Sequence, residues 1–133
     1  MPDQILFRSA FGALESALDI SHKRNNVISS NISNLETPGY KARDIDFKTA
    51  MAQAMGSEPE TGLTVTDKGH MGAEKGVDPE PFEEAGEWNG YNWMSVDTTM
   101  NKLTENNMIY RTATEVLLRK IVIMKDVIRE GGR

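Results

Sequence analysis

Hydrophobic positions recur at alternating spacings of four and three residues near both ends of the chain, and the middle lacks this rhythm. A 3.5-residue repeat keeps one apolar stripe facing a partner helix, as in coiled-coil packing. The pattern therefore predicts two long terminal helices, each with a narrow stripe that we call its seam. The first seam reads Phe7, Phe11, Leu14, Leu18, Ser21, Asn25, Ile28, Ile32 and Leu35. The second reads Val96, Met100, Leu103, Asn107, Tyr110, Thr114, Leu117, Ile121, Met124 and Ile128.

Start and stop signals bound these helices. Asp3 is a suitable N-cap for a helix over residues 1–36, and Pro38 disfavours helix at the residue before it. Pro38 and Gly39 suit the centre of a type II turn, with Gly39 at positive φ. Residues 37–55 should hold this turn and a short segment with one or two helical turns. Ser95 or Asp97 would cap the last helix, within residues 94–133.

Residues 56–93 have a different composition from the two ends. They hold seven glycines, three prolines and nine acidic side chains against two basic ones, a net charge of −7, whereas the whole chain carries −5. Such a segment buries too little apolar surface to offset the entropy of ordering it. We expect a Gly-rich acidic loop region with one short strand at 63–66, in which Glu84→Ala should be nearly silent.

The lengths of the helices predict the overall shape. Helices of roughly 32 and 34 residues would be about 48 and 51 Å long, whereas a compact chain of this size has a radius of gyration of about 14 Å. We therefore expect an elongated all-α fold. Its helices 1–36 and 94–133 would pair as one coiled-coil-like stem domain, antiparallel to each other or set against neighbours.

Few residues suggest catalytic or ligand chemistry. The chain has no cysteine, and its two histidines, His22 and His70, are expected to be solvated polar residues rather than metal ligands. Asp44 and Asp46 are expected to be solvated charges, because no calcium-loop glycine accompanies them. The sequence thus predicts no catalytic, cofactor or metal site and no enzyme. We also expect no nucleic-acid footprint, no membrane span and no cleaved secretory signal.

Polar and aromatic residues near the seams allow more than one interpretation. Ser21 and Asn25 interrupt the first seam, and Asn107 and Thr114 interrupt the second. They are either tolerated positions beside the surface or buried polar groups that fix the register of the helices. The aromatic cluster before the last helix should pin the loop to the stem, and exposed aromatics also serve as interface anchors. This cluster comprises Trp88, Tyr91 and Trp93.

The most specific motif lies in residues 29–41, which read Ser-Ser-Asn-Ile-Ser-Asn-Leu-Glu-Thr-Pro-Gly-Tyr-Lys. It resembles the N-terminal motif of the axial proteins of the bacterial flagellum, which comprise rod, hook and hook-associated proteins. Their pattern is roughly Ser-Asn-Ile-Ala-Asn-x-x-Thr-Pro-Gly-Tyr, and Ser33 stands where alanine is usual. The matching residues, which we call the turn motif, are Asn31, Asn34, Thr37, Pro38, Gly39 and Tyr40.

Two further segments narrow the resemblance to flagellar basal-body rod proteins, closest to the proximal rod family FlgB. These are 41–47, with sequence Lys-Ala-Arg-Asp-Ile-Asp-Phe, and 96–107, which is followed by Tyr110. A weaker similarity to the same family lies at residues 63–66, which are followed a few residues later by His70.

The resemblance implies a structural subunit of the proximal rod, part of the drive shaft between the MS ring with its export gate and the distal rod. Its terminal helices would pair and line the inner tube of the assembly. It implies export through the flagellar type III apparatus to a periplasmic rod. The implied partners are other copies of the chain, neighbouring rod proteins and the FliE-type adaptor.

Two other functions stay open from the sequence. One is a different rod subunit of the FlgC type, against which segment 41–47 argues. The other is a cytosolic helical-hairpin adaptor, which would explain the seams but gives no reason for the turn motif. A small enzyme would need a convergent polar site, which we do not find.

Overall fold

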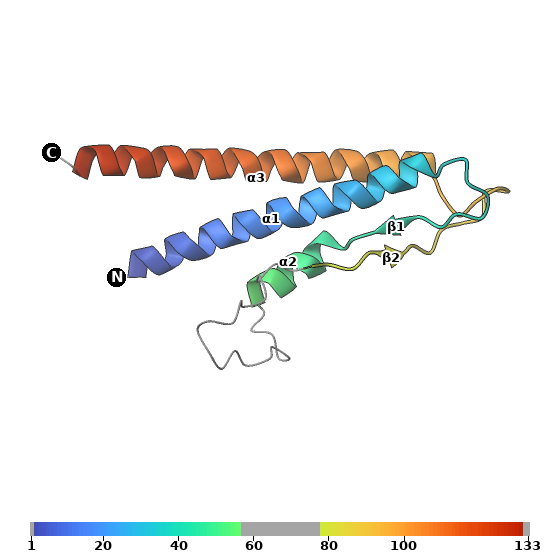
Figure 1. The fold of residues 1–133 in the computed structure, drawn as a ribbon, viewed down its shortest axis with the longest axis horizontal. Helices are drawn as coiled ribbons and strands as arrows, with labels where there is room; N and C mark the ends of the chain where they lie inside the picture. Colours follow the sequence, from blue (N-terminus) through green and yellow to red (C-terminus); the bar gives the residue numbers. More distant parts are fainter. Residues whose placement is uncertain (1, 57–77, 132–133) are drawn as a thin grey trace, which may run out of the picture.

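A computed structural model describes residues 2–56 and 78–131, with side chains from Ser9 onward. The elements in this part of the chain are α1 (Pro2–Ser33), β1 (Arg43–Asp44), α2 (Phe47–Gly56), β2 (Phe82–Glu83) and α3 (Val96–Gly131). Helices α1 and α3 run antiparallel, so the start of α1 and the end of α3 lie at the same end of an elongated molecule (Figure 1). The expected elongated all-α architecture, with long terminal helices, is confirmed.

Local sequence signals explain where the helices end. After α1 the chain turns at Pro38, where Tyr40 N donates to the Thr37 carbonyl at 3.3 Å. Gly39 has the expected positive φ, 71°, a conformation that costs residues with a Cβ more than glycine. At the start of α3, the Ser95 hydroxyl accepts a hydrogen bond from Thr98 N at 3.4 Å. Ser95 is therefore the N-cap of α3.

Helix α1 lies between two other parts of the molecule, α3 on one side and α2 with the two strands on the other (Figure 1). A buried apolar cluster joins Ile20 of α1 to Ile45 and Ala50, which are 1%, 1% and 2% exposed. Partly buried residues complete this cluster: Val27, Phe47, Met51 and Ala54. Helix α1 therefore buries two faces, and the segment after the turn is part of the core.

The segment before α3 makes more contacts with the rest of the protein than its composition predicts. β2 pairs antiparallel with β1, with Arg43 opposite Glu83. Trp93 N donates to the Tyr40 carbonyl and Gly39 N to the Tyr91 carbonyl, both at 2.9 Å. Residues 82–93 thus lie along the chain that follows the turn and bind its backbone. The helical turns expected before residue 56 are confirmed as α2, whereas the strand expected at 63–66 and His70 lie outside the described residues.

Candidate functional site: the turn motif, a buried ion-pair network and the exposed face of α3

Asn31 is the centre of the turn motif. It is 2% exposed, and its Nδ2 donates to the Arg43 carbonyl at 2.7 Å. Its Oδ1 accepts from Arg43 N at 3.0 Å and from the Tyr40 hydroxyl at 3.2 Å. One side chain near the end of α1 therefore satisfies both backbone groups of the first residue of β1. This contact sets the direction in which the chain leaves the turn.

The end of α1 is capped by its own motif residues and by the segment before α3. Asn34 Nδ2 donates to the Ser30 carbonyl at 2.8 Å, and the Thr37 hydroxyl donates to Asn34 Oδ1 at 3.2 Å. The last carbonyls of a helix lack partners within it. Just after the helix, Asn92 Nδ2 donates to the Leu35 carbonyl at 2.7 Å, and the Tyr91 hydroxyl donates to the Glu36 carbonyl at 2.6 Å. The expected pinning of the loop to the stem is confirmed for Tyr91.

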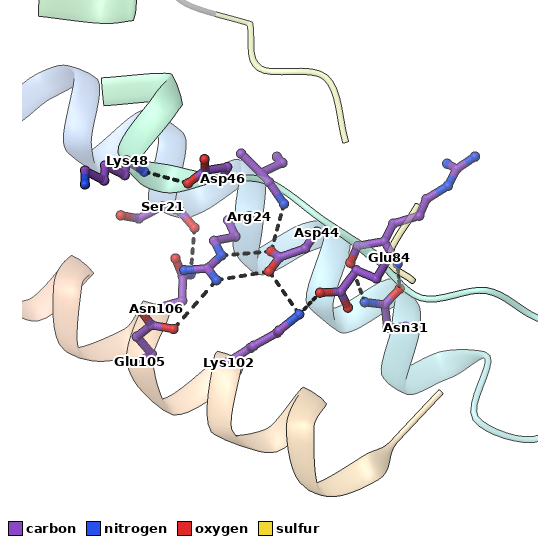
Figure 2. A network of polar contacts seen from close by, with 12 residues as sticks. Ser21, Arg24, Asn31, Asp44, Asp46, Lys48, Glu84, Lys102, Glu105 and Asn106 are labelled. Atoms are coloured by element: carbon purple, nitrogen blue, oxygen red, sulfur yellow. Dashed lines mark hydrogen bonds and ion pairs between the residues drawn. The ribbon is translucent and has the colours of Figure 1, made fainter. Parts of the chain in front are cut away.

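A buried ion-pair network joins α1, β1 and α3 (Figure 2). Arg24 Nε and Nη2 donate to the two carboxylate oxygens of Asp44, at 2.8 and 3.1 Å. Lys102 Nζ of α3 lies 3.3 Å from Asp44 Oδ2 and also pairs with Glu84. Glu105 Oε2 lies 3.7 Å from Arg24 Nη2. Helix α1, the chain after the turn, the residue that follows β2 and helix α3 thus converge on one set of charges.

The network shifts the pKa of its central groups. Burial of the Asp44 carboxyl would raise its pKa, but hydrogen bonds from Arg24 and Ile45 N, together with the charges of Arg24 and Lys102, lower it below its ordinary value. The hydrogen bond to Asp44 raises the pKa of Arg24, against the effect of burial. Both groups are therefore charged in the folded protein near neutral pH.

The expectation of a solvated charge was wrong for Asp44, because pairing with Arg24 and Lys102 takes it out of bulk solvent. Glu84 is half-buried and pairs with Lys102, so the expectation that Glu84→Ala is nearly silent stays a prediction. The expectation of a solvated charge was right for the exposed Asp46. Asp46 Oδ1 accepts from Lys48 N at 3.1 Å, and its carboxylate also binds the Thr49 hydroxyl. The bond from Thr49 is the main cause that lowers the pKa of Asp46. Asp46 thereby caps the start of α2.

The closest contact of α3 with α1 lies along small and polar residues. The fully buried residues of α3 are Thr99, Asn106 and Ala113, spaced seven apart. Asn106 Nδ2 donates to the Ser21 carbonyl at 2.8 Å. Small side chains at such positions let two helices approach closely, while larger ones pack beside them. The line of closest contact on α3 therefore does not coincide with the seam: each of these buried residues stands one position before a seam residue.

Most of the seam of α1 lies against other parts of the molecule. Ser21 and Ile28 are buried, and the remaining described members are half-buried: Phe11, Leu14, Leu18, Asn25, Ile32 and Leu35. The side chain of Phe7 lies outside the described residues. Of the polar interruptions on this helix, Ser21 is therefore an interior residue.

The seam of α3 divides into two groups. The half-buried members are Leu103, Thr114, Leu117 and Met124. The apolar members left exposed are Val96, Met100, Tyr110, Ile121 and Ile128, at 44 to 70%. Asn107 is also exposed, so it is a surface position rather than an interior polar group. The five exposed apolar residues, which we call the exposed seam, form a stripe that this chain alone does not cover.

Within the described residues, no group of three or more acidic or histidine side chains is placed to hold a metal ion. His22 is exposed, as expected. None of the helices in this part of the chain has the length and apolarity needed to cross a membrane.

Sequence reasoning missed the ion-pair network, although one signal was present. Arg24 lies four residues from each of Ile20 and Ile28, and all three are buried. Residues four apart lie on the same face of a helix. An arginine placed between two isoleucines of a buried face needs a buried anion as its partner.

Comparisons with known proteins agree with the motif. Residues 11–41 match the family model of the flagella basal body rod protein. The flagellar basal body rod protein FlgB of Aeromonas hydrophila is 32% identical over 120 residues, covering 88% of this chain and 90% of that protein. FlgB of Cereibacter sphaeroides is 33% identical over 121 residues, covering 86% and 90%. FlgB of Escherichia coli is 28% identical over 127 residues, covering 89% and 91%.

Proposed function

Because this chain belongs to the FlgB family of flagellar basal body rod proteins, we propose that it builds the proximal rod by packing its exposed seam against neighbouring subunits. It is a structural subunit of the periplasmic rod and not an enzyme. As part of the drive shaft, it would connect the MS ring and export gate to the distal rod. Its neighbours there would be other copies of itself, other rod proteins and the FliE-type adaptor.

The exposed seam is the observation that carries this proposal. Its five large apolar side chains lie along α3 beside the half-buried members that face α1. Large exposed apolar side chains aligned along one face of a helix indicate an interaction site. A neighbouring helix on the exposed seam would extend the stem's own interior without rearranging it. The residues of the turn motif, by contrast, bind within the chain and set its shape.

The thin interior supports a second part of the proposal. Only eight hydrophobic residues of the described chain are buried, and long helices gain most of their stability from packing. We therefore expect the free subunit to be only marginally stable, which suits export through the type III apparatus before assembly. Hydrogen exchange should be fast in the distal half of α3 in the free chain and slow in the rod. Strong protection of that half in the free monomer would contradict this part.

Deleting the gene in its host and imaging purified basal bodies tests the function. Without the gene we expect MS rings that lack a rod, and wild type should restore the rod. Ile121→Lys should fail to restore it, because it places a charge in the exposed seam. Ile123→Lys is the matched control: Ile123 is 60% exposed and is displaced by about 200° around the helix.

Two results would contradict the proposal. Intact rods and normal motility without the gene would show that the chain is not a required rod subunit. Equal rescue by Ile121→Lys and Ile123→Lys would show that the exposed seam is not the assembly surface. Leu117→Lys and Leu14→Lys are weaker tests, because both residues are half-buried and a lysine there would also disturb folding.

A further inference from the structure

Asn89 and Gly90 form the single Asn-Gly pair of the chain. In such a pair the glycine nitrogen can attack the side-chain amide carbon of the asparagine, because glycine has no side chain to obstruct the approach. Gly90 N gives up its proton to water as its bond to Asn89 Cγ forms, and the amide nitrogen takes up a proton and leaves as ammonia. Water then opens the resulting succinimide ring to aspartate or isoaspartate. The net reaction is the hydrolysis of one amide to a carboxylate, and it needs no oxidant or reductant.

Both polar atoms of the Asn89 side chain are engaged in the folded chain. Its Oδ1 accepts hydrogen bonds from Tyr91 N and Asn92 N, both at 2.9 Å. Its Nδ2 donates to Asn92 Oδ1 at 2.8 Å and to the Met94 carbonyl at 2.9 Å. Ring closure requires the amide group to turn until its carbon meets Gly90 N, and this turn would break the hydrogen bonds. The fold therefore opposes the reaction by holding the amide in place.

Burial does not protect this pair, because Asn89 and Gly90 are both exposed. Water and base can therefore reach the amide. Gly90 has a φ of 95°, and its nitrogen forms no hydrogen bond with the residues that the structure describes. The hydrogen bonds of the Asn89 side chain are thus what separates a protected asparagine from a reactive one.

The residues that Asn89 holds also bind the end of α1. Asn92 Nδ2 donates to the Leu35 carbonyl at 2.7 Å, and the Tyr91 hydroxyl donates to the Glu36 carbonyl at 2.6 Å. Asn89 does not contact α1 itself. It acts through Tyr91 and Asn92, whose backbone nitrogens it binds, so it is a positioning residue for this contact.

Deamidation would remove the donor from position 89. A carboxylate there would place an oxygen opposite two acceptors, Asn92 Oδ1 and the Met94 carbonyl. Turning over the Asn92 amide would relieve one of these contacts, but it would withdraw the donor from the Leu35 carbonyl. Isoaspartate would also add one carbon to the main chain, where Asn89 N now donates to the Asn92 carbonyl at 3.1 Å. Either product should therefore loosen the contact with α1.

We propose that Asn89 is a deamidation site that is reactive in the unfolded chain and protected in the folded one. Folding must then precede deamidation if residues 89–94 are to bind the end of α1. A chain that stays unfolded would lose this contact progressively and irreversibly. The inference concerns the single chain and does not depend on how copies assemble.

Incubation of the purified full chain near neutral pH, over a series of guanidinium chloride concentrations, tests the protection. Mass spectrometry of proteolytic peptides measures deamidation at position 89, and circular dichroism measures the unfolded fraction. The rate should rise in parallel with that fraction and be at least about tenfold slower in the folded chain than in the unfolded one. A synthetic peptide of residues 86–93 is the control, and denaturant should not change its rate. A folded chain that deamidates as fast as this peptide would overturn the inference.

Asn92→Ala tests the hydrogen bonds directly, because it keeps the Asn-Gly pair and removes one acceptor of Asn89 Nδ2. It should speed deamidation of the folded chain by at least about threefold and leave the unfolded rate unchanged. An unchanged rate in the folded variant would contradict the role of these bonds. If Asn92→Ala does not fold, the comparison of wild type with the peptide still decides the inference.

Asn89→Asp tests the consequence, because it introduces one of the two products. Gly39 N donates to the Tyr91 carbonyl, so amide exchange at Gly39 should accelerate by about tenfold. Asn26→Asp adds the same charge at an exposed position of α1 and should leave this exchange unchanged. Equal exchange in the two variants would show that deamidation does not loosen the contact with α1.

Discussion

Arg24 and Asp44, 20 positions apart in sequence, form a buried two-pronged ion pair with nitrogen–oxygen distances of 2.8 and 3.1 Å. Arg24 belongs to α1 and Asp44 to the segment after the turn, and Lys102 of α3 binds the same carboxylate at 3.3 Å. One carboxylate therefore holds three segments together. The direction of the chain after the turn and the packing of α3 on α1 depend on this common contact.

Arg24→Ala should destabilise the chain strongly, because it leaves Asp44 as a buried charge without its main partner. We expect a loss of about 3 kcal/mol in the free energy of unfolding, measured by urea denaturation. Lys41→Ala is the matched control, since the Lys41–Glu83 pair is 54% and 57% exposed and should contribute less than about 1 kcal/mol. Similar losses in the two variants would show that the buried pair contributes no more to stability than the exposed pair does.

Stability should fall in acid because folding lowers the pKa of Asp44. The folded state then binds fewer protons at this group than the unfolded state does. Its contribution to stability is complete above the unfolded pKa of about 3.9 and is lost as the pH falls through the lower folded pKa. Urea denaturation of wild type and Asp44→Asn should show a large difference at pH 7 that narrows towards pH 3. A difference that stays constant with pH would contradict this assignment.

Asn31→Ala should cost more than Asn34→Ala, although both residues belong to the turn motif. Asn31 makes three hydrogen bonds to the segment after the turn, and its loss should cost about 2 kcal/mol. The Asn34 side chain bonds exposed groups near its own helix end, and we expect less than about 1 kcal/mol. Urea denaturation measures both, and amide exchange at Arg43 should accelerate only in Asn31→Ala. Equal losses in the free energy of unfolding would show that Asn31 is not the central residue of the turn motif.

Gly39→Val should lower the melting temperature, because a β-branched residue at a φ of 71° costs about 1–2 kcal/mol. Gly39→Asn should be milder, since asparagine tolerates this conformation better. Gly12→Ala is the control: Gly12 lies within α1, and a Cβ there meets nothing within 4 Å. It should stabilise the chain by about 0.5–1 kcal/mol. A melting temperature unchanged by Gly39→Val would refute the role of Gly39 in the turn.

The helices and the turn could be predicted because their signals are local. The repeated spacing of apolar residues marks both long helices, and Pro38 with Gly39 marks where the first must end. The strands could not be predicted in the same way. β1 and β2 span two residues each, too few to show an alternating pattern.

The exact packing of the stem was also beyond sequence reasoning. The seam follows the largest apolar side chains, whereas close approach of two helices favours small ones such as Thr99 and Ala113. Asn106 is buried and its neighbour Asn107 is exposed, a difference of one position that apolar spacing does not resolve. The pairing of Arg24 with Asp44 depends on the turn bringing distant segments together, so neither residue reveals it alone.

Thiol labelling within the assembled rod tests the central claim most directly, because the natural chain has no cysteine. Ile121→Cys and Ile123→Cys each introduce one thiol, at positions that are 44% and 60% exposed. Both variants should react quickly with a maleimide as free subunits. In purified basal bodies, we expect Ile121→Cys to be protected by at least about tenfold, because a neighbouring subunit covers the exposed seam, and Ile123→Cys to stay reactive. Equal reactivity of the two thiols in the assembled rod would contradict assembly through the exposed seam.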